Sequence, residues 1–130
     1  MPPVLNARLI MVFAFMVMMM ACMNTSAQAA KFSGLYLLQI CASDQNGKEL
    51  VPNGHITCQS YISGVIDYHN LIRSLGTGPS VDFCIPDKEP LERIQANVLA
   101  YLYNHKKIHE SFVASPAVAL GLHQAYPCKK

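Results

Sequence analysis

The stretch CQSYISGVIDYHNLI, residues 58–72, decides the fold. Side chains suited to burial recur in it at the i, i+3, i+4 and i+7 spacing that lines one face of an α-helix over four turns. The members of this row are Cys58, Tyr61, Ile62, Val65, Ile66, His69 and Ile72. Ser63 and Gly64 flank the row, and their small size predicts close approach of a neighbouring helix. We expect a central helix that ends at the glycines and the proline of SLGTGPSVDF, residues 74–83.

Three weaker patterns surround this helix. Residues 32–43, FSGLYLLQICAS, have short amphipathic spacing, and the Asn-Gly and Pro signals of residues 44–54 predict a loop. Residues 91–102 carry a third apolar row. We expect its helix to have Pro90 in the first turn and Asp87 or Glu89 as the cap. We expect a last helix from Ser115 as N-cap and Pro116 as first helical residue to about Tyr126. Alternation typical of strands is not sustained anywhere, so the sequence predicts an all-α bundle of about four short helices.

The N-terminus has the pattern of a secretory signal peptide. Arg8 precedes an uninterrupted apolar run, residues 9–23, and the small residues around Ala27 and Ala29 follow. The run falls short of the roughly 20 residues of a membrane span. We expect cleavage after Ala29, export to the periplasm and no membrane attachment of the processed chain. An uncleaved anchor and a lipoprotein acylated at Cys22 are the alternatives.

Composition limits the function of the remaining 101 residues, 30–130. This length allows one small domain with a modest core. Its nine Lys and Arg nearly balance its eight Asp and Glu. The longest basic runs are two residues, Lys106-Lys107 and Lys129-Lys130, so the concentrated positive stripe that nucleic-acid binding needs is missing.

Four cysteines remain after the leader, namely Cys41, Cys58, Cys84 and Cys128. An even number in a short exported chain is typical of two disulfides, which a thin bundle needs for stability. A metal site is the rival interpretation, but metal-binding cysteines usually come in CxxC-type pairs and these lie 17, 26 and 44 residues apart. Three pairings are possible, and the spacing does not choose among them.

The sequence offers little for catalysis. His105 and His109 lie four residues apart with Glu110 adjacent, but a zinc site needs three or four ligands, and a polar helix end explains them equally well. Asp67 has no catalytic partner nearby, so we expect it to be structural. Nucleophile elbows and phosphate-binding glycine loops are missing, and paired cysteines leave no thiolate. We therefore expect a binding protein without cofactor or metal, and not an enzyme.

Five short motifs together resemble the Rap/Tai family of small periplasmic immunity proteins, which protect bacteria against type VI secretion amidase effectors. The motifs are YLLQIC at 36–41, CQSYISGVID at 58–67, FCIP at 83–86, YLYNH at 101–105 and HQAYPC at 123–128. They span nearly the whole processed chain and include all four of its cysteines. The acidic, proline-led DKEPLERIQ at 87–95 and the proline in HESFVASP at 109–116 depart from the family pattern, which affects loop conformation more than fold.

The resemblance implies a four-helix fold, often a homodimer, that covers or plugs the active-site cleft of a peptidoglycan amidase. The fold also resembles small periplasmic acid-stress chaperones, whose single disulfide corresponds to Cys58 and Cys84. That likeness implies a Cys58–Cys84 bond and leaves Cys41 to pair with Cys128. A stress chaperone is accordingly the alternative function, and a small disulfide-stabilised enzyme is a third.

Specific inhibition of one effector is expected to depend on variable loops carried by a rigid frame. The two candidate segments are residues 44–49 and 104–110; the alternative for both is an ordinary solvated loop. The candidate effector-binding residues are Asp44, Asn46, Lys48, Asn104, His105, Lys106, Lys107 and His109.

Overall fold

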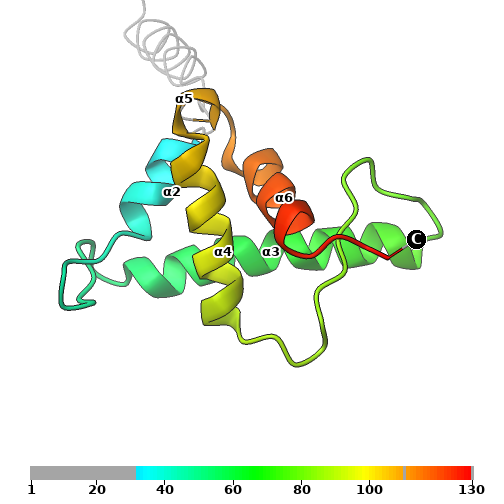
Figure 1. The fold of residues 1–130 in the computed structure, drawn as a ribbon, viewed down its shortest axis with the longest axis horizontal. Helices are drawn as coiled ribbons and strands as arrows, with labels where there is room; N and C mark the ends of the chain where they lie inside the picture. The colour runs from blue at the N-terminus through cyan, green and yellow to red at the C-terminus, as the bar shows by residue number, and fades with distance from the viewer. Residues whose placement is uncertain (1–31, 110, 130) are drawn as a thin grey trace, which may run out of the picture. The chain divides into compact units, whose positions relative to one another are not determined.

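The computed structural model describes residues 32–109 and 111–129, which hold five helices (Figure 1). They are α2 (Gly34–Ile40), α3 (Gly54–Ser74), α4 (Leu91–Asn104), α5 (Lys106–His109) and α6 (Ala114–Ala125). The all-α prediction is confirmed, with the single turn of α5 added to the four expected helices. Over these residues no helix is long and apolar enough to cross a membrane. The expected leader, its cleavage site, Cys22 and Glu110 lie outside the described residues.

The long helix α3 is the central element, and α2, α4 and α6 all pack against it (Figure 1). Its buried face carries Cys58, Ile62 and His69, as the spacing predicted. The helix begins at Gly54, which lies against the carbonyl oxygen of Ile40 with no room for a Cβ atom. The close approach predicted at Gly64 is wrong, because a Cβ added there would meet nothing within 4 Å.

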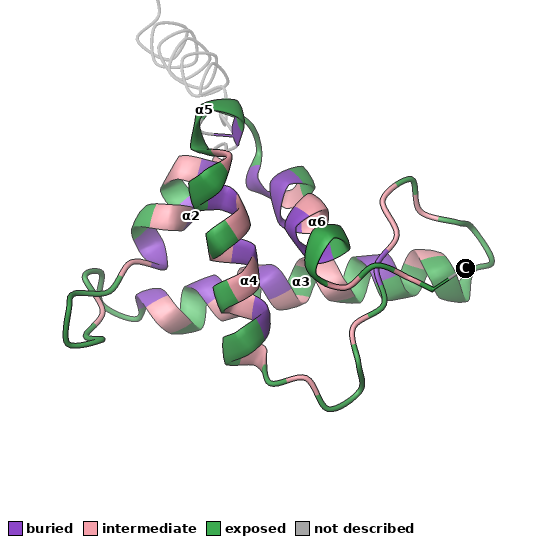
Figure 2. Ribbon diagram, viewed as in Figure 1, coloured by how far each residue is buried: buried purple, intermediate pink, exposed green. Residues whose placement is uncertain are grey.

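The buried residues lie mainly where α2, α4 and α6 meet α3 (Figure 2). The core that they form is small and mostly aliphatic. Its largest fully buried side chains are Leu37, Ile62, Leu102, Leu122, Val98, Val118 and Cys58. α4 and α6 approach closely because Gly121 of α6 packs on the Tyr101 side chain of α4, where a Cβ would sit 3.2 Å from the tyrosine Cβ. The buried faces of α3 and α4 therefore follow the predicted rows. The expected row of the first helix, which included Leu35, Tyr36 and Gln39, is wrong, because α2 buries Gly34, Leu37 and Ile40 instead.

Helix starts differ from the prediction in two places. Pro90 is itself the N-cap of α4, and Glu89 instead accepts a hydrogen bond from the Tyr126 hydroxyl at 3.2 Å. α6 begins at Ala114, and the Ser115 hydroxyl makes a 2.8 Å hydrogen bond with the Tyr61 hydroxyl rather than capping the helix. Both polar side chains bond to residues far away in the sequence, which local capping rules do not consider.

The disulfide pairing differs from the one implied by the resemblance. Cys41 is bonded to Cys58, and Cys84 is bonded to Cys128, so the expected Cys58–Cys84 and Cys41–Cys128 bonds are wrong. Cys58 lies near the start of α3, whereas Cys84 lies beside Arg73 at the end of α3. Fifteen residues of helix separate these two ends by about 22 Å, which no disulfide can span.

Candidate functional site

A groove between α2 and α4 has a volume of about 780 Å³. It is open to solvent along its length, and most of its lining is apolar. The lining residues are Leu35, Leu38, Gln39, Cys41, Ala42 and Ser43 on the α2 side, and Leu99, Ala100, Tyr103, Asn104 and Lys106 on the α4 side. An apolar floor with a few polar groups at its margin is typical of a binding site.

One end of the groove is bounded by the loop that follows Ser43, the first candidate segment. Within this loop the Asp44 carboxylate accepts hydrogen bonds from the backbone amides of Asn46, at 2.8 Å, and Lys48, at 2.9 Å. The Asp44 amide donates to the Lys48 carbonyl at 2.9 Å, and Gly47 supplies the positive φ of 79° that the turn requires. The segment is therefore a closed turn held by its own bonds, and the Asp44 side chain is committed to that turn.

The side chains of Asn46 and Lys48 remain exposed on this turn. Behind them, Glu49 accepts a 3.0 Å hydrogen bond from the backbone amide of His55 in the first turn of α3. The Ser43 hydroxyl lies 2.6 Å from Nε2 of the same histidine. These contacts fasten the turn to α3 from the side opposite its exposed tip.

The other end of the groove is bounded by α5, the second candidate segment. Lys106 and Lys107 are exposed, as are Tyr103 (73 %) and Ile108 (63 %). A second hollow of about 550 Å³ lies among residues 103–108 and shares three of them with the groove. Residues 103–108 thus form an exposed segment in which the two lysines lie between the exposed side chains of Tyr103 and Ile108.

His105 and His109 hold this segment against the rest of the protein. The His105 ring stacks on Tyr101 with a centroid distance of 4.2 Å, and its Nδ1 donates to the Tyr101 carbonyl at 2.8 Å. His109 is only 8 % exposed, and its backbone carbonyl packs on Gly34 so tightly that a Cβ there would be 2.6 Å away. Burial, and secondarily the neighbouring His105, lowers the pKa of His109 below its ordinary value.

The structure therefore divides the predicted binding residues into two groups. Asn46, Lys48, Asn104, Lys106 and Lys107 are exposed and available to a partner. Asp44, His105 and His109 instead hold the two segments in shape. The sequence places the residues of both groups in the same two segments, but it does not indicate which way each side chain faces.

Sequence reasoning missed the groove itself and the partly or fully exposed apolar side chains that line it. Leu35, Leu99 and Tyr103 fall beside the buried rows of α2 and α4, and they mark the groove. The available signal was that both helices carry apolar residues outside the row that faces α3. Among the described residues, no group of three or more histidine, cysteine or acidic side chains is arranged to hold a metal ion.

Fold and site together define a small, disulfide-stapled helical protein that presents a groove between two rigid exposed segments. Residues 33–128 match the family model of the Rap1a immunity proteins, and the chain belongs to this family. The match covers all five described helices and both disulfides. The chain matches no curated protein and no solved structure.

Proposed function

We propose that this immunity protein acts in the periplasm, where it binds a peptidoglycan amidase delivered by a type VI secretion system and inhibits it. The groove between α2 and α4 takes a protruding edge of the amidase, while α5 covers or enters the active-site cleft. The protein turns over no substrate of its own. The observation that carries this proposal is the groove itself, apolar along its floor and bounded at each end by an exposed segment.

Rigidity of the two segments supports tight inhibition. A loop that is ordered before binding loses less conformational entropy when the complex forms, so more of the contact energy appears as affinity. The turn around Asp44 is closed by its own hydrogen bonds, and α5 is anchored through buried His109. Exposed aromatic side chains such as Tyr103 are the residue type that most often dominates binding energy.

Charge near the groove indicates the sign of the surface it fits. Lys106 lines the groove, and Lys107 and Lys48 lie exposed at its two ends, whereas the Asp44 carboxylate is held by backbone amides. We expect acidic groups on the facing amidase surface, and a faster association at low salt than at high salt.

The proposal expects a gene for an exported amidase beside this one; the test purifies its product and titrates it with the processed chain by calorimetry. Tyr103→Ala is expected to weaken binding by about 2 kcal/mol, roughly thirtyfold, because it removes an exposed anchor from the groove. Ile56→Ala is the control, since Ile56 is similarly exposed (65 %) but lies near the start of α3, outside the groove residues. Equal affinity of both variants and the parent would remove the groove from consideration.

The same preparation separates immunity from the alternative function of a stress chaperone. An immunity protein rescues cells from lysis by that amidase and blocks its hydrolysis of peptidoglycan at one-to-one ratio. A chaperone instead suppresses aggregation of unrelated proteins in acid without affecting the amidase. Absence of an amidase gene nearby, together with such general protection, would contradict the proposed function.

We also propose that the protein forms a homodimer through the C-terminal half of α3. Tyr68 and Leu71 of this helix and Leu75, its C-cap, lie one to two turns apart and are each more than half exposed. The C-terminal end of α3 is largely exposed (Figure 2). A two-fold contact pairs the same face of both copies, so this row would pack against the same row of the second copy. Leu71→Asp is expected to give a monomer in sedimentation, with Tyr103→Ala as the control that stays dimeric; a parent protein that is monomeric at all concentrations overturns this proposal.

A further inference from the structure

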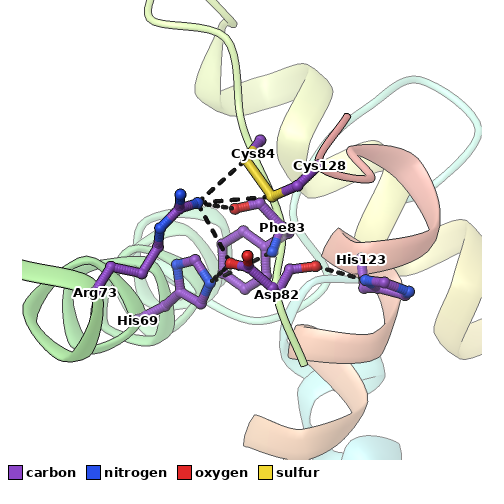
Figure 3. The surroundings of a disulfide bond; sticks show 7 residues. All are labelled: His69, Arg73, Asp82, Phe83, Cys84, His123 and Cys128. Atoms are coloured by element: carbon purple, nitrogen blue, oxygen red, sulfur yellow. Dashed lines mark hydrogen bonds and ion pairs between the residues drawn. A yellow bond between two sulfur atoms is a disulfide. The ribbon is translucent and has the colours of Figure 1, made fainter. Parts of the chain in front are cut away.

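The two disulfides lie in opposite environments. Cys41 and Cys58 are 3 % and 0 % exposed and belong to the core. Cys84 is exposed and Cys128 is half-buried, in the segments that follow α3 and α6 (Figure 3). Thiol–disulfide exchange requires a thiolate to approach a sulfur atom, so only the second bond is open to direct attack.

A guanidinium group also lies against the second bond. Nη1 of Arg73, at the end of α3, is 3.1 Å from Sγ of Cys84 and 3.6 Å from Sγ of Cys128 (Figure 3). The same nitrogen donates to the Asp82 carboxylate at 3.3 Å, which orients the guanidinium toward the sulfur pair. A positive charge at this distance stabilises a thiolate and thereby makes the corresponding sulfur a better leaving group.

The position of Asp82 is fixed in turn by a buried histidine. His69 is 6 % exposed, stacks on the Phe83 ring with a centroid distance of 3.7 Å, and donates from Nε2 to the Asp82 carboxylate at 2.9 Å. Its Nδ1 is buried without a hydrogen-bond partner in the described structure. His69 and Arg73, one turn apart on α3, thus both hold the Asp82 carboxylate (Figure 3). These bonds keep the Arg73 guanidinium against the disulfide.

We propose that Cys84–Cys128 is a site of thiol–disulfide exchange with an external dithiol, while Cys41–Cys58 stays closed. A thiolate of the dithiol attacks Sγ of Cys128 and forms a mixed disulfide, and the Cys84–Cys128 bond breaks. Its electron pair stays on Sγ of Cys84, which leaves as a thiolate beside Arg73. The second thiolate of the dithiol then attacks the mixed disulfide and releases Cys128, so the dithiol is oxidised by two electrons and both cysteine thiolates take protons from water according to pH.

Opening this bond frees the residues that follow Tyr126 without unfolding the bundle. After reduction, the tail is still connected by the hydrogen bond from the Cys84 amide to the Tyr126 carbonyl, at 2.8 Å, and by the Tyr126 hydroxyl. The groove between α2 and α4 stays anchored by Cys41–Cys58. Reduction of Cys84–Cys128 is therefore independent of the proposed inhibition and leaves amidase binding unchanged.

The first experiment treats the oxidised, purified chain with dithiothreitol at neutral pH, alkylates it at intervals and assigns each labelled cysteine by mass spectrometry. We expect Cys84 and Cys128 to become labelled together at least roughly tenfold faster than Cys41 and Cys58, because only the former pair is accessible. The helical circular dichroism should stay unchanged during this first phase. Equal rates, or labelling of either pair only after the helices are lost, would overturn the proposal.

A second experiment tests the role of Arg73. Arg73→Gln should slow reduction of Cys84–Cys128 by roughly three- to tenfold, whereas Arg73→Lys keeps the charge and most of the rate. Arg93→Gln is the control, because Arg93 is an exposed arginine of α4 that pairs with Glu89, away from the sulfur atoms. An Arg73→Gln protein that is reduced at the parent rate, with unchanged thermal unfolding, would contradict the assignment.

The Cys128→Ser variant supplies a readout that does not depend on the exchange rate. In it the Cys84 thiol is free beside Arg73, and its reaction with iodoacetamide as a function of pH reports the thiol pKa. We expect a value below the ordinary one of about 8.5, and a return toward it when Arg73→Gln is added. A thiol that titrates at its ordinary value with Arg73 present would oppose the proposal.

Discussion

At the residue scale, His109 is a polar residue with a structural role, because it holds α5 against the rest of the protein. It is buried, its Nε2 lies 3.4 Å from the Tyr101 hydroxyl, and its backbone carbonyl packs on Gly34. A histidine that folding removes from water resists protonation, because the charged form loses its hydration. The same residue that fixes α5 therefore also makes that fixation sensitive to acid.

We predict that stability falls as the pH drops below about 6.5. The pKa of His109 is lowered in the folded chain, first by burial and then by His105, so the unfolded chain binds the proton at a higher pH. Above the unfolded pKa both states are neutral and His109 contributes nothing to the pH dependence; below it, protonation favours unfolding. The thermal midpoint measured from pH 7.5 to 5 should fall, and His109→Gln should flatten this slope.

His55→Gln serves as the control for removing a histidine, because His55 lies at the opposite end of the groove beside Glu49. A His109→Gln profile that matches the parent would show that the acid sensitivity arises elsewhere.

At the element scale, glycines set how closely the helices pack. Gly54 brings the start of α3 against the carbonyl of Ile40, at the end of α2, while Gly64 in the same helix faces open space. Two glycines ten residues apart in one helix thus have opposite roles. Sequence alone identified only Gly64, and assigned it the role that Gly54 has.

Substitution of these two glycines by alanine should change stability in opposite directions. Gly54→Ala forces α2 away from α3 and should cost about 2 kcal/mol, as overpacking does elsewhere. Gly64→Ala meets no neighbour and gains helix propensity, so it should stabilise by about 0.5–1 kcal/mol. Urea unfolding of both variants measures the difference, and destabilisation by Gly64→Ala in the monomeric state would contradict the open surroundings of Gly64.

The helices could be predicted from the sequence because burial rows repeat locally, and residues 58–72 form the clearest of them. What could not be predicted depends on partners distant in the chain. Ser115 looks like a cap but bonds Tyr61, and the cysteine spacing is compatible with every pairing. The candidate segments were predicted from their polar composition, whereas the groove between them exists only once α2 and α4 lie side by side.

At the scale of the whole molecule, two disulfides stabilise a bundle whose core is small. Loop entropy alone would make the Cys84–Cys128 bond the stronger staple, at about 4 kcal/mol against about 3 kcal/mol for Cys41–Cys58. Only the Cys41–Cys58 bond, however, is buried in the core. Its removal leaves empty space as well as a longer unrestrained chain.

We predict that the Cys41→Ala/Cys58→Ala double variant loses more stability than Cys84→Ala/Cys128→Ala. The cavity left by two buried sulfur atoms should add about 1–3 kcal/mol to the entropy term and reverse the order that loop length gives. Thermal unfolding monitored by circular dichroism ranks the two variants. A larger loss for the Cys84–Cys128 pair would show that loop length outweighs packing in this fold.

The native bonds join consecutive cysteines of the described residues, Cys41 with Cys58 and Cys84 with Cys128. A polypeptide that emerges N-terminus first exposes Cys41 and Cys58 to an oxidant before Cys84 has appeared. Oxidation in order of emergence therefore produces the correct covalent structure directly. We expect maturation of this protein to proceed without help from a disulfide isomerase, which a nested arrangement of the same cysteines would require.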